Sequence, residues 1–170
     1  MNITYVEGDA TVPNKIDGIN ILIHVVNDIG AMGSGIAASI KKKWPKVYKA
    51  YNDLFSEPAY KRLTAQGQIQ VVDVGESLFV VNLFGQSGVG DMDGFAPVRY
   101  GAIEEGLMKI ASIINARKGT EQSVALHMGR IGCGLAGGSW SKVEEIIHRV
   151  FSTTKVFIIV YDFPGSAFNP

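Results

Sequence analysis

Two glycine-rich stretches have the composition of loops that bind phosphate groups. The first loop, GAMGSGIA at residues 30–37, follows an apolar run and precedes a helical pattern. The second loop, GRIGCGLAGGSW at residues 129–140, has the same surroundings. Glycine lets the backbone approach a ligand closely, and the start of a helix presents N–H groups without partners. Both features favour an anion, so the two loops together predict a diphosphate held from both sides.

Polar side chains before and inside these loops are the candidates for chemistry. His24 lies in the apolar run, where a histidine is often a hydrogen-bonded core residue, but a neutral imidazole near phosphate could also serve as general acid or base near pH 7. Asn27 ends that run, and its amide can both donate to and accept from hydroxyl groups. Cys133 lies between two glycines with no base nearby in sequence, which indicates a small space-filling residue.

Other nucleotide and metal motifs fit less well. The chain has no G-x-x-x-x-G-K-[ST] motif, which excludes a P-loop nucleoside triphosphatase. Residues 33–38 match G-x-G-x-x-A, but a dinucleotide fold needs a strand soon after the first helix, and the next strand signal begins only at Ile69. A dehydrogenase of that type remains a rival that should prefer NAD. Three scattered histidines and one cysteine show no ligand spacing, so we expect neither a metal nor a cofactor.

Apolar runs alternate with helical patterns along the whole chain. The predicted strands are Ile3–Glu7, Ile19–Val26, Ile69–Val74, Leu78–Phe84, Ser123–Met128 and Lys155–Tyr161. The predicted helices cover Ile36–Trp44, Pro45–Phe55, Tyr100–Ile114 and Ser141–Val150, the last with a capping box at Ser141-x-x-Glu144. Strands that are apolar on both faces belong in a sheet covered on both sides. We therefore predict an α/β fold, a three-layer α/β/α sandwich with a mixed, largely parallel six-stranded sheet, in one domain over residues 1–170.

Composition narrows the classes of partner. Hydrophobic residues make up 46% and charged residues 19% of the chain, and the formal net charge is zero, so no overall field favours nucleic acid or an anionic membrane. The run Lys41–Lys43 is interpreted as the solvated end of a helix. No apolar stretch is long enough to span a membrane. One cysteine allows no internal disulfide and the N-terminus lacks signal-peptide features, so we expect a cytoplasmic protein.

Three segments together resemble the macrodomain family. They are ITYVEGDA near the N-terminus, LIHVVNDIGAMGSGIA, and RIGCGLAGG before a helix. The closest likeness is to the branch of the terminal ADP-ribose protein glycohydrolase and the yeast-type ADP-ribose 1″-phosphate phosphatase, and it spans Ile3 to Phe163. The resemblance implies a three-layer α/β/α fold that binds ADP-ribose or its 1″-phosphate.

The resemblance also implies roles for individual residues. Asp9 would accept a hydrogen bond from the adenine amino group, although Asp9 could instead cap a turn. Ala10 and Gln86 are also predicted to bind the ligand. Phe163 would pack on adenine, although an aromatic there could also be core. Asn27 matches the asparagine at the distal ribose, and His24 matches a histidine of the phosphatase-like relatives. Backbone amides would hold the phosphates; they belong to Gly33, Ser34, Gly35 and Ile36 in the first loop and to Gly132, Cys133, Gly134, Leu135, Ala136 and Gly137 in the second.

The chain departs from the glycohydrolase branch at two positions. That branch has a lysine after the middle strand and an aspartate in the second loop, where this chain has Gln86 and Ala136. Without an amine no Schiff base can form, so we expect removal of phosphate from ADP-ribose 1″-phosphate by water instead. The alternatives are a non-catalytic reader of ADP-ribose, free or on macromolecules, and an ADP-ribosyl-protein hydrolase. Asp91 and Asp93 in the irregular segment 86–97 could approach a ligand, but they also suit a solvated loop.

Overall fold

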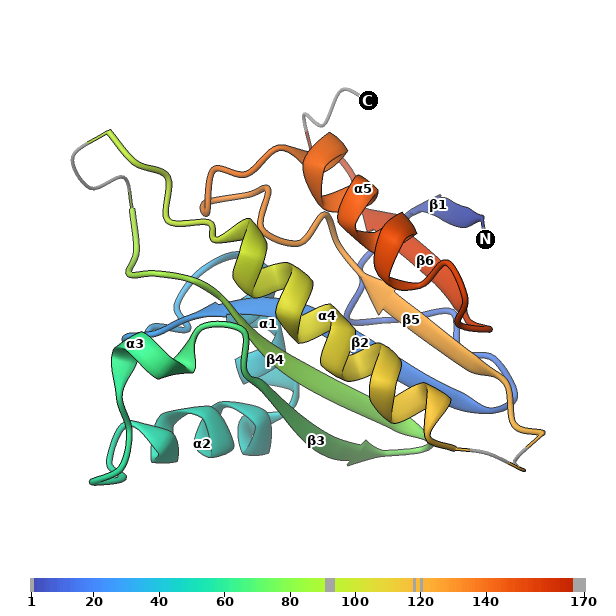
Figure 1. Cartoon of the computed structure of the whole chain (residues 1–170), viewed down its shortest axis with the longest axis horizontal. Coiled ribbons are helices and arrows are strands. Elements are labelled where there is room, and N and C mark those ends of the chain that lie inside the picture. Colours follow the sequence, from blue (N-terminus) through green and yellow to red (C-terminus); the bar gives the residue numbers. More distant parts are fainter. Residues whose placement is uncertain (1, 91–93, 118, 120, 167–170) are drawn as a thin grey trace.

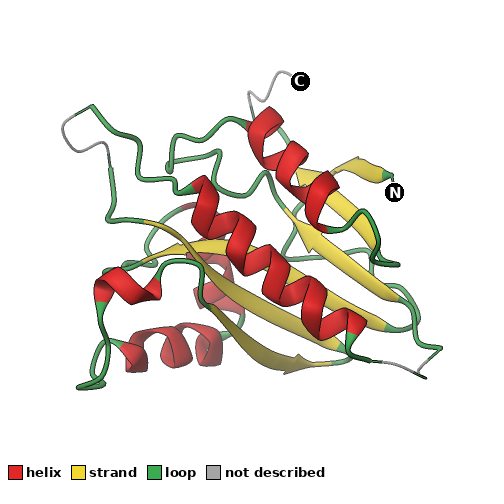
Figure 2. Ribbon diagram, viewed as in Figure 1, coloured by secondary structure: helices red, strands yellow, loops and turns green. Residues whose placement is uncertain are grey.

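The structure is a computed structural model that describes residues 2–90, 94–117, 119 and 121–166. This part of the chain forms six strands and five helices (Figures 1 and 2). The strands are β1 (Ile3–Glu7), β2 (Ile19–Asn27), β3 (Ile69–Gly75), β4 (Leu78–Gln86), β5 (Val124–Met128) and β6 (Phe157–Asp162). The helices are α1 (Gly35–Lys43), α2 (Pro45–Leu54), α3 (Arg62–Ala65), α4 (Tyr100–Asn115) and α5 (Trp140–Val150).

One sheet joins all six strands in the order β1-β6-β5-β2-β4-β3. Every pairing is parallel except that of β3 with β4, which are joined by Glu76 and Ser77 with φ angles of 52° and 58°. Two successive residues with positive φ form the kind of tight turn that matches the twist of a hairpin. This turn explains why β3 runs against the other strands. The predicted mixed, largely parallel sheet is confirmed.

Helices cover both faces of the sheet, as the apolar strands require. Figure 1 shows α4 and α5 on the near face and α1 and α2 behind the sheet. The near-face core includes Leu107, Ile147 and Phe151, and the far-face core includes Ile40 and Val47, all fully buried. The predicted three-layer α/β/α arrangement is therefore confirmed. No helix in the described ranges is long and apolar enough to cross a membrane.

Two local predictions differ from the structure. Helix α3 was not predicted, because a four-residue helix is too short to show an amphipathic period. The capping box at Ser141 is wrong: α5 begins at Trp140 after the N-cap residue Ser139, so Ser141 already lies within the helix. Its hydroxyl lies 2.9 Å from that of Ser139, and no side chain caps the helix.

The carboxyl ends of five strands meet at one edge of the sheet. Asn27 at the end of β2 pairs with Gln86 at the end of β4, and β5 and β6 pair through Met128 and Val160. Strand β4 lies on one side of β2 and strand β5 on the other, so the strand order reverses direction at β2. Ligands in open α/β sheets bind at such a reversal of strand order, beyond the carboxyl ends. The fold therefore brings the two glycine loops together.

Candidate functional site

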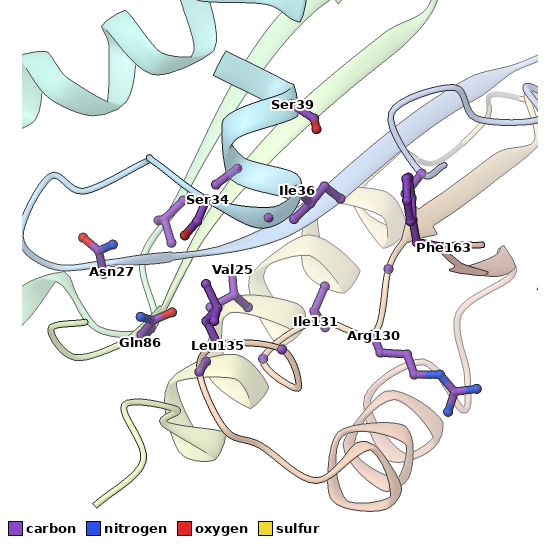
Figure 3. Close-up of a pocket in the computed structure, with 18 of the residues that line it drawn as sticks. Val25, Asn27, Ser34, Ile36, Ser39, Gln86, Arg130, Ile131, Leu135 and Phe163 are labelled. Atoms are coloured by element: carbon purple, nitrogen blue, oxygen red, sulfur yellow. The ribbon is translucent and has the colours of Figure 1, made fainter. Parts of the chain in front are cut away.

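A cavity of about 830 Å³ lies beyond those strand ends. Its walls come from the segments after β1, β2, β4, β5 and β6, and include both glycine loops. Figure 3 shows Phe163 at one end of the cavity and Asn27 and Gln86 at the other. The volume is within the range of sites that enclose a nucleotide-sized ligand. The cavity is thus elongated between an aromatic end and an amide end.

Most of the predicted site residues line this cavity. They are Asp9, Ala10, Asn27, Gly33, Ser34, Gly35, Ile36, Gln86, Gly132, Gly134, Leu135, Ala136 and Phe163. His24, Cys133 and Gly137 do not. Asp91 and Asp93 lie outside the described residues. The structure thus places residues from five separate segments, up to 154 positions apart between Asp9 and Phe163, around one space.

The turn before the first loop is held by the side chain of Asn27. Its Oδ1 accepts hydrogen bonds from the N–H groups of Ile29 and Ala31, at 3.1 and 3.0 Å, and from the Tyr51 hydroxyl at 2.7 Å. Its Nδ2 donates to the carbonyl oxygen of Ala31 at 2.6 Å. Tyr51 is fully buried and comes from α2, so the turn is fixed from below. One N–H of the Asn27 amide is left for a ligand.

The first loop presents backbone N–H groups to the cavity. Ser34 is the N-cap residue of α1, but its side chain caps nothing, and the first turn contains no acidic residue. Within the described structure, no acceptor bonds the N–H groups of Gly33, Ser34, Gly35 or Ile36. Gly35 has φ +57°, a conformation that favours glycine. The helix dipole adds positive potential at the same place, so this loop suits an anion.

Some backbone N–H groups of the second loop form hydrogen bonds inside the loop, and others face the cavity without a described acceptor. The N–H of Cys133 donates to Arg130 O at 3.1 Å, and that of Gly137 donates to Gly134 O at 2.9 Å, so these two amides close turns inside the loop. Four of the cavity-lining residues of this loop have amides that donate to no described atom; they are Gly132, Gly134, Leu135 and Ala136. The amides of Cys133 and Gly137, which were predicted to bind the ligand, are thus engaged inside the loop and shape it.

Cys133 is a space-filling residue, as its sequence surroundings indicated. Its Sγ donates to the carbonyl oxygen of Ile131 at 3.3 Å. Burial raises the pKa of the thiol to about 11, which keeps it protonated at neutral pH. Gly132 has φ +73°, and a Cβ there would lie 2.9 Å from Ile103 Cδ1. The positive φ together with the close Ile103 side chain therefore favours glycine at this position.

Asp9 has one oxygen engaged and one directed elsewhere. Oδ1 accepts hydrogen bonds from both the N–H and the hydroxyl of Thr11, each at 2.8 Å, so Asp9 caps its turn through this oxygen. No described residue donates to Oδ2. Phe163 is 62% exposed at the cavity wall, so it is not a core residue. This end of the cavity therefore offers an acceptor and an aromatic face.

His24 does not reach the cavity. It is fully buried on β2, and its Nε2 lies 2.5 Å from Oδ1 of Asn82, the residue paired with it on β4. Asn82 Nδ2 donates to Gln70 Oε1 at 2.9 Å, so Asn82 Oδ1 is the acceptor and His24 Nε2 the donor. Burial lowers the pKa of His24 to about 4. The predicted acid–base role is therefore corrected: His24 is a neutral member of a polar ladder inside the core.

The residues around the cavity that were not predicted include Asp28, Tyr51, Tyr161 and Arg130. Asp28 is buried, and its carboxylate accepts from Gly88 N at 2.8 Å and from Gln66 Nε2 at 3.1 Å, which fixes the segment after β4. Tyr51 supports Asn27, Tyr161 lines the cavity, and Arg130 starts the second loop. Of these residues, only Asp28 could have been noticed in the sequence. It is an acid directly after a buried strand, where little water solvates a carboxylate.

The electrostatics of the cavity come mainly from backbone groups. Among the described lining residues the charged side chains are Asp9 and Arg130, and Figure 3 shows the Arg130 guanidinium pointing away from the cavity. Gln86 is at the cavity wall and donates from Nε2 to Gly88 O at 2.9 Å. No described cluster of three or more His, Cys, Asp or Glu side chains could hold a metal ion. The arrangement can bind an anion through amides and admit water beside it.

Comparisons with known proteins agree with this geometry. No protein-family model matches the chain. The structure of a macrodomain protein from Streptomyces coelicolor is 34% identical with a TM-score of 0.76, over 95% of this chain and 99% of that one. The ADP-ribose glycohydrolase OARD1 of Bos taurus is 27% identical over 94% of this chain and 90% of its own length. The ADP-ribose 1″-phosphate phosphatase of Debaryomyces hansenii is 22% identical over 94% and 99%.

Proposed function

The chain belongs to the macrodomain family, and on that premise we propose that its cavity binds ADP-ribose and that the protein hydrolyses ADP-ribose derivatives. The observation that carries the proposal is the meeting of two sets of unbonded amide N–H groups in one cavity, from Gly33–Ile36 in the first loop and from Gly132, Gly134, Leu135 and Ala136 in the second. A diphosphate needs donors on both sides, and amides held by a folded loop supply them without a change of shape. ATP and NAD should bind more weakly than ADP-ribose.

The two ends of the cavity suit the two ends of ADP-ribose. Asp9 Oδ2 can accept from the adenine amino group, and Phe163 can stack on the base. The distal ribose then lies near Asn27 and Gln86, at the opposite end of the cavity (Figure 3). There the remaining N–H of Asn27 can meet a ribose hydroxyl. This orientation is supported by the positions of Phe163 at one end of the cavity and of Asn27 and Gln86 at the other.

We propose further that the substituent removed from the distal ribose is a phosphate. A water oxygen attacks phosphorus, the bond from phosphorus to the C1″ oxygen breaks, and that oxygen takes a proton to leave ADP-ribose. The added charge is stabilised by loop amides. Gln86 and Ala136 support this choice over the lysine-dependent route, because neither supplies an amine or a carboxylate at the cavity wall. The name of the D. hansenii relative agrees with it.

The glycohydrolase name of the OARD1 relative favours a second candidate, an ADP-ribosyl-protein hydrolase. Two measurements separate the possibilities. Calorimetry with ADP-ribose, NAD and ATP tests the binding, and tighter binding of NAD would contradict it. Release of phosphate from ADP-ribose 1″-phosphate, beside release of ADP-ribose from an ADP-ribosylated protein, tests the reaction. A protein that binds ADP-ribose and releases neither product is a reader rather than a hydrolase.

A further inference from the structure

Arg130 and Asp162 form a forked ion pair beside the cavity. Arg130 Nε lies 2.6 Å from Asp162 Oδ1, and Nη2 lies 2.9 Å from Oδ2. The Arg130 side chain is only 8% exposed and that of Asp162 30%. Two parallel charge-assisted hydrogen bonds fix both distance and orientation, unlike a single flexible contact. The pair is therefore a rigid connection between the two residues.

The pair connects the two chain segments that carry Phe163 and the second loop. Asp162 is the last residue of β6 and directly precedes Phe163, at the adenine end. Arg130 is the second residue after β5, where the second loop begins. Since β5 and β6 are neighbouring parallel strands, the pair spans the gap that opens where their hydrogen bonding ends. A movement of Phe163 relative to the second loop would break it.

Aromatic side chains hold the guanidinium in place. Its central carbon lies 5.3 Å from the ring centre of Tyr5 on β1 and 5.5 Å from that of Trp140, the first residue of α5. Trp140 Nε1 donates to the Tyr5 hydroxyl at 2.9 Å, and that hydroxyl donates to Glu144. Planar guanidinium groups stack on aromatic faces in a way that a lysine ammonium cannot. Three elements, β1, β6 and α5, therefore converge on Arg130.

Arg130 and Asp162 are both ionised at neutral pH. The Arg130 hydrogen bonds lower the pKa of Asp162, and those of Asp162 raise the pKa of Arg130. Both groups therefore remain charged at neutral pH. The guanidinium points away from the cavity (Figure 3), so Arg130 acts on a ligand through the elements it connects.

We propose that Arg130 and Asp162 are positioning residues that fix the spacing between Phe163 and the amides of the second loop, and so favour a ligand that joins a base to a diphosphate. This inference rests on the proposed function, ADP-ribose in this cavity. A ligand that spans two parts whose spacing varies must order them on binding and loses affinity for that reason. A fragment that contacts only one part does not.

The test compares a spanning ligand with fragments. Arg130→Lys keeps the charge but loses the fork and the stacking, and Asp162→Asn removes the charge at nearly constant shape. We expect each to weaken ADP-ribose binding by about 10-fold, the effect of about 1.4 kcal/mol. Binding of adenosine, which probes the Phe163 end, and of pyrophosphate, which probes the loops, should change by less than about 2-fold on the same reasoning. NMR titration measures all three dissociation constants.

Arg149→Lys is the matched control. Arg149 pairs with Glu104 at 2.9 Å between α5 and α4, with 53% and 33% of the side chains exposed and no part in the cavity wall. It should leave all three dissociation constants unchanged, since an exposed pair contributes little. Urea unfolding of each variant shows the fraction folded.

The outcomes are distinct. Selective loss of ADP-ribose affinity in Arg130→Lys and Asp162→Asn, with fragment binding kept, supports the inference. Equal losses for ligand and fragments, or no loss at all, overturn it while the proposed function stands. Wild-type protein that binds no ADP-ribose overturns the proposed function and this inference with it.

Discussion

The hydroxyl of Tyr51 donates a hydrogen bond to the side-chain oxygen of Asn27, across 2.7 Å, from beneath the turn that precedes α1. That oxygen also accepts two backbone N–H groups of the turn. The amide at the end of β2 is therefore first a scaffold, and only its second N–H can reach a ligand. A contact with ribose, which the resemblance implied, is compatible with this arrangement but is not its main role.

Tyr51→Phe and Asn27→Ala separate these two roles. Tyr51→Phe removes the hydroxyl that lies 2.7 Å from Oδ1 and 2.9 Å from the carbonyl oxygen of Asn27, and should weaken ADP-ribose binding by no more than roughly 0.5–1.5 kcal/mol. Asn27→Ala removes the scaffold and the remaining N–H, and should cost about 1 kcal/mol more. Its turnover should fall further than its affinity, because the distal ribose is no longer fixed relative to the attacking water. Equal effects in calorimetry and rate assays would leave Asn27 with the scaffold role alone.

Asp9→Asn should lower ADP-ribose affinity by roughly 1–3 kcal/mol. The amide oxygen can still accept from Thr11, but the amide nitrogen cannot accept the adenine amino group. Thr11→Val is the matched control, since it removes the hydroxyl contact with Oδ1 and leaves Oδ2 intact. A second comparison uses a ligand with hypoxanthine in place of adenine, which lacks the amino group. If the wild type binds both ligands equally, Asp9 only caps its turn.

Gly134→Val should abolish ADP-ribose binding in a protein that still folds. A Cβ at this position meets nothing within 4 Å, so the protein itself has room for it, but Gly134 faces the cavity. A branched side chain there occupies the space where a phosphate must approach the amide. Gly101→Val is the control, because a Cβ at Gly101 also meets nothing and α4 presents it away from the lining. Normal binding by Gly134→Val would place the diphosphate elsewhere.

The fold could be predicted largely because its strands are apolar on both faces. Runs such as those of β2 and β6 leave few alternatives to a covered parallel sheet, and β1 was predicted with its observed bounds, Ile3–Glu7. Helix ends were harder, because a cap depends on one residue's backbone angles. Ser139 and Ser141 are both suitable N-cap residues, and only the structure shows that α5 starts between them.

The site was less predictable at the level of single atoms. Glycine clusters indicate where a backbone approaches a ligand, but not which amides are already used inside the loop, as those of Cys133 and Gly137 are. His24 is the clearest case. A strand position near the ligand end is compatible with either face of the sheet, and the residue's pairing with Asn82 placed it in the core. The ion pair of Arg130 and Asp162 joins residues 32 positions apart and had no local signal.

The buried histidines should make stability fall in mild acid. Burial lowers the pKa of His24 and of His127 to about 4, whereas an unfolded histidine titrates near about 6.5. Between these values the unfolded chain binds more protons than the folded one. The free energy of unfolding therefore has its highest value above about pH 6.5 and decreases as the pH falls toward 4. Each histidine should account for a loss of roughly 3 kcal/mol across this window.

His24→Gln tests the assignment of His24 to the core. The glutamine amide can replace Nε2 as donor to Asn82 but does not titrate. Between pH 7 and pH 4 the variant should therefore lose about half as much free energy of unfolding as the wild type. Urea unfolding measures both proteins, each relative to its own value at pH 7. The rate of phosphate release per folded molecule should keep its wild-type dependence on pH between 6 and 8, because an imidazole that is neutral throughout this range and bonded inside the sheet transfers no proton to the cavity. A rate profile that flattens near neutrality in His24→Gln would show instead that His24 takes part in the reaction.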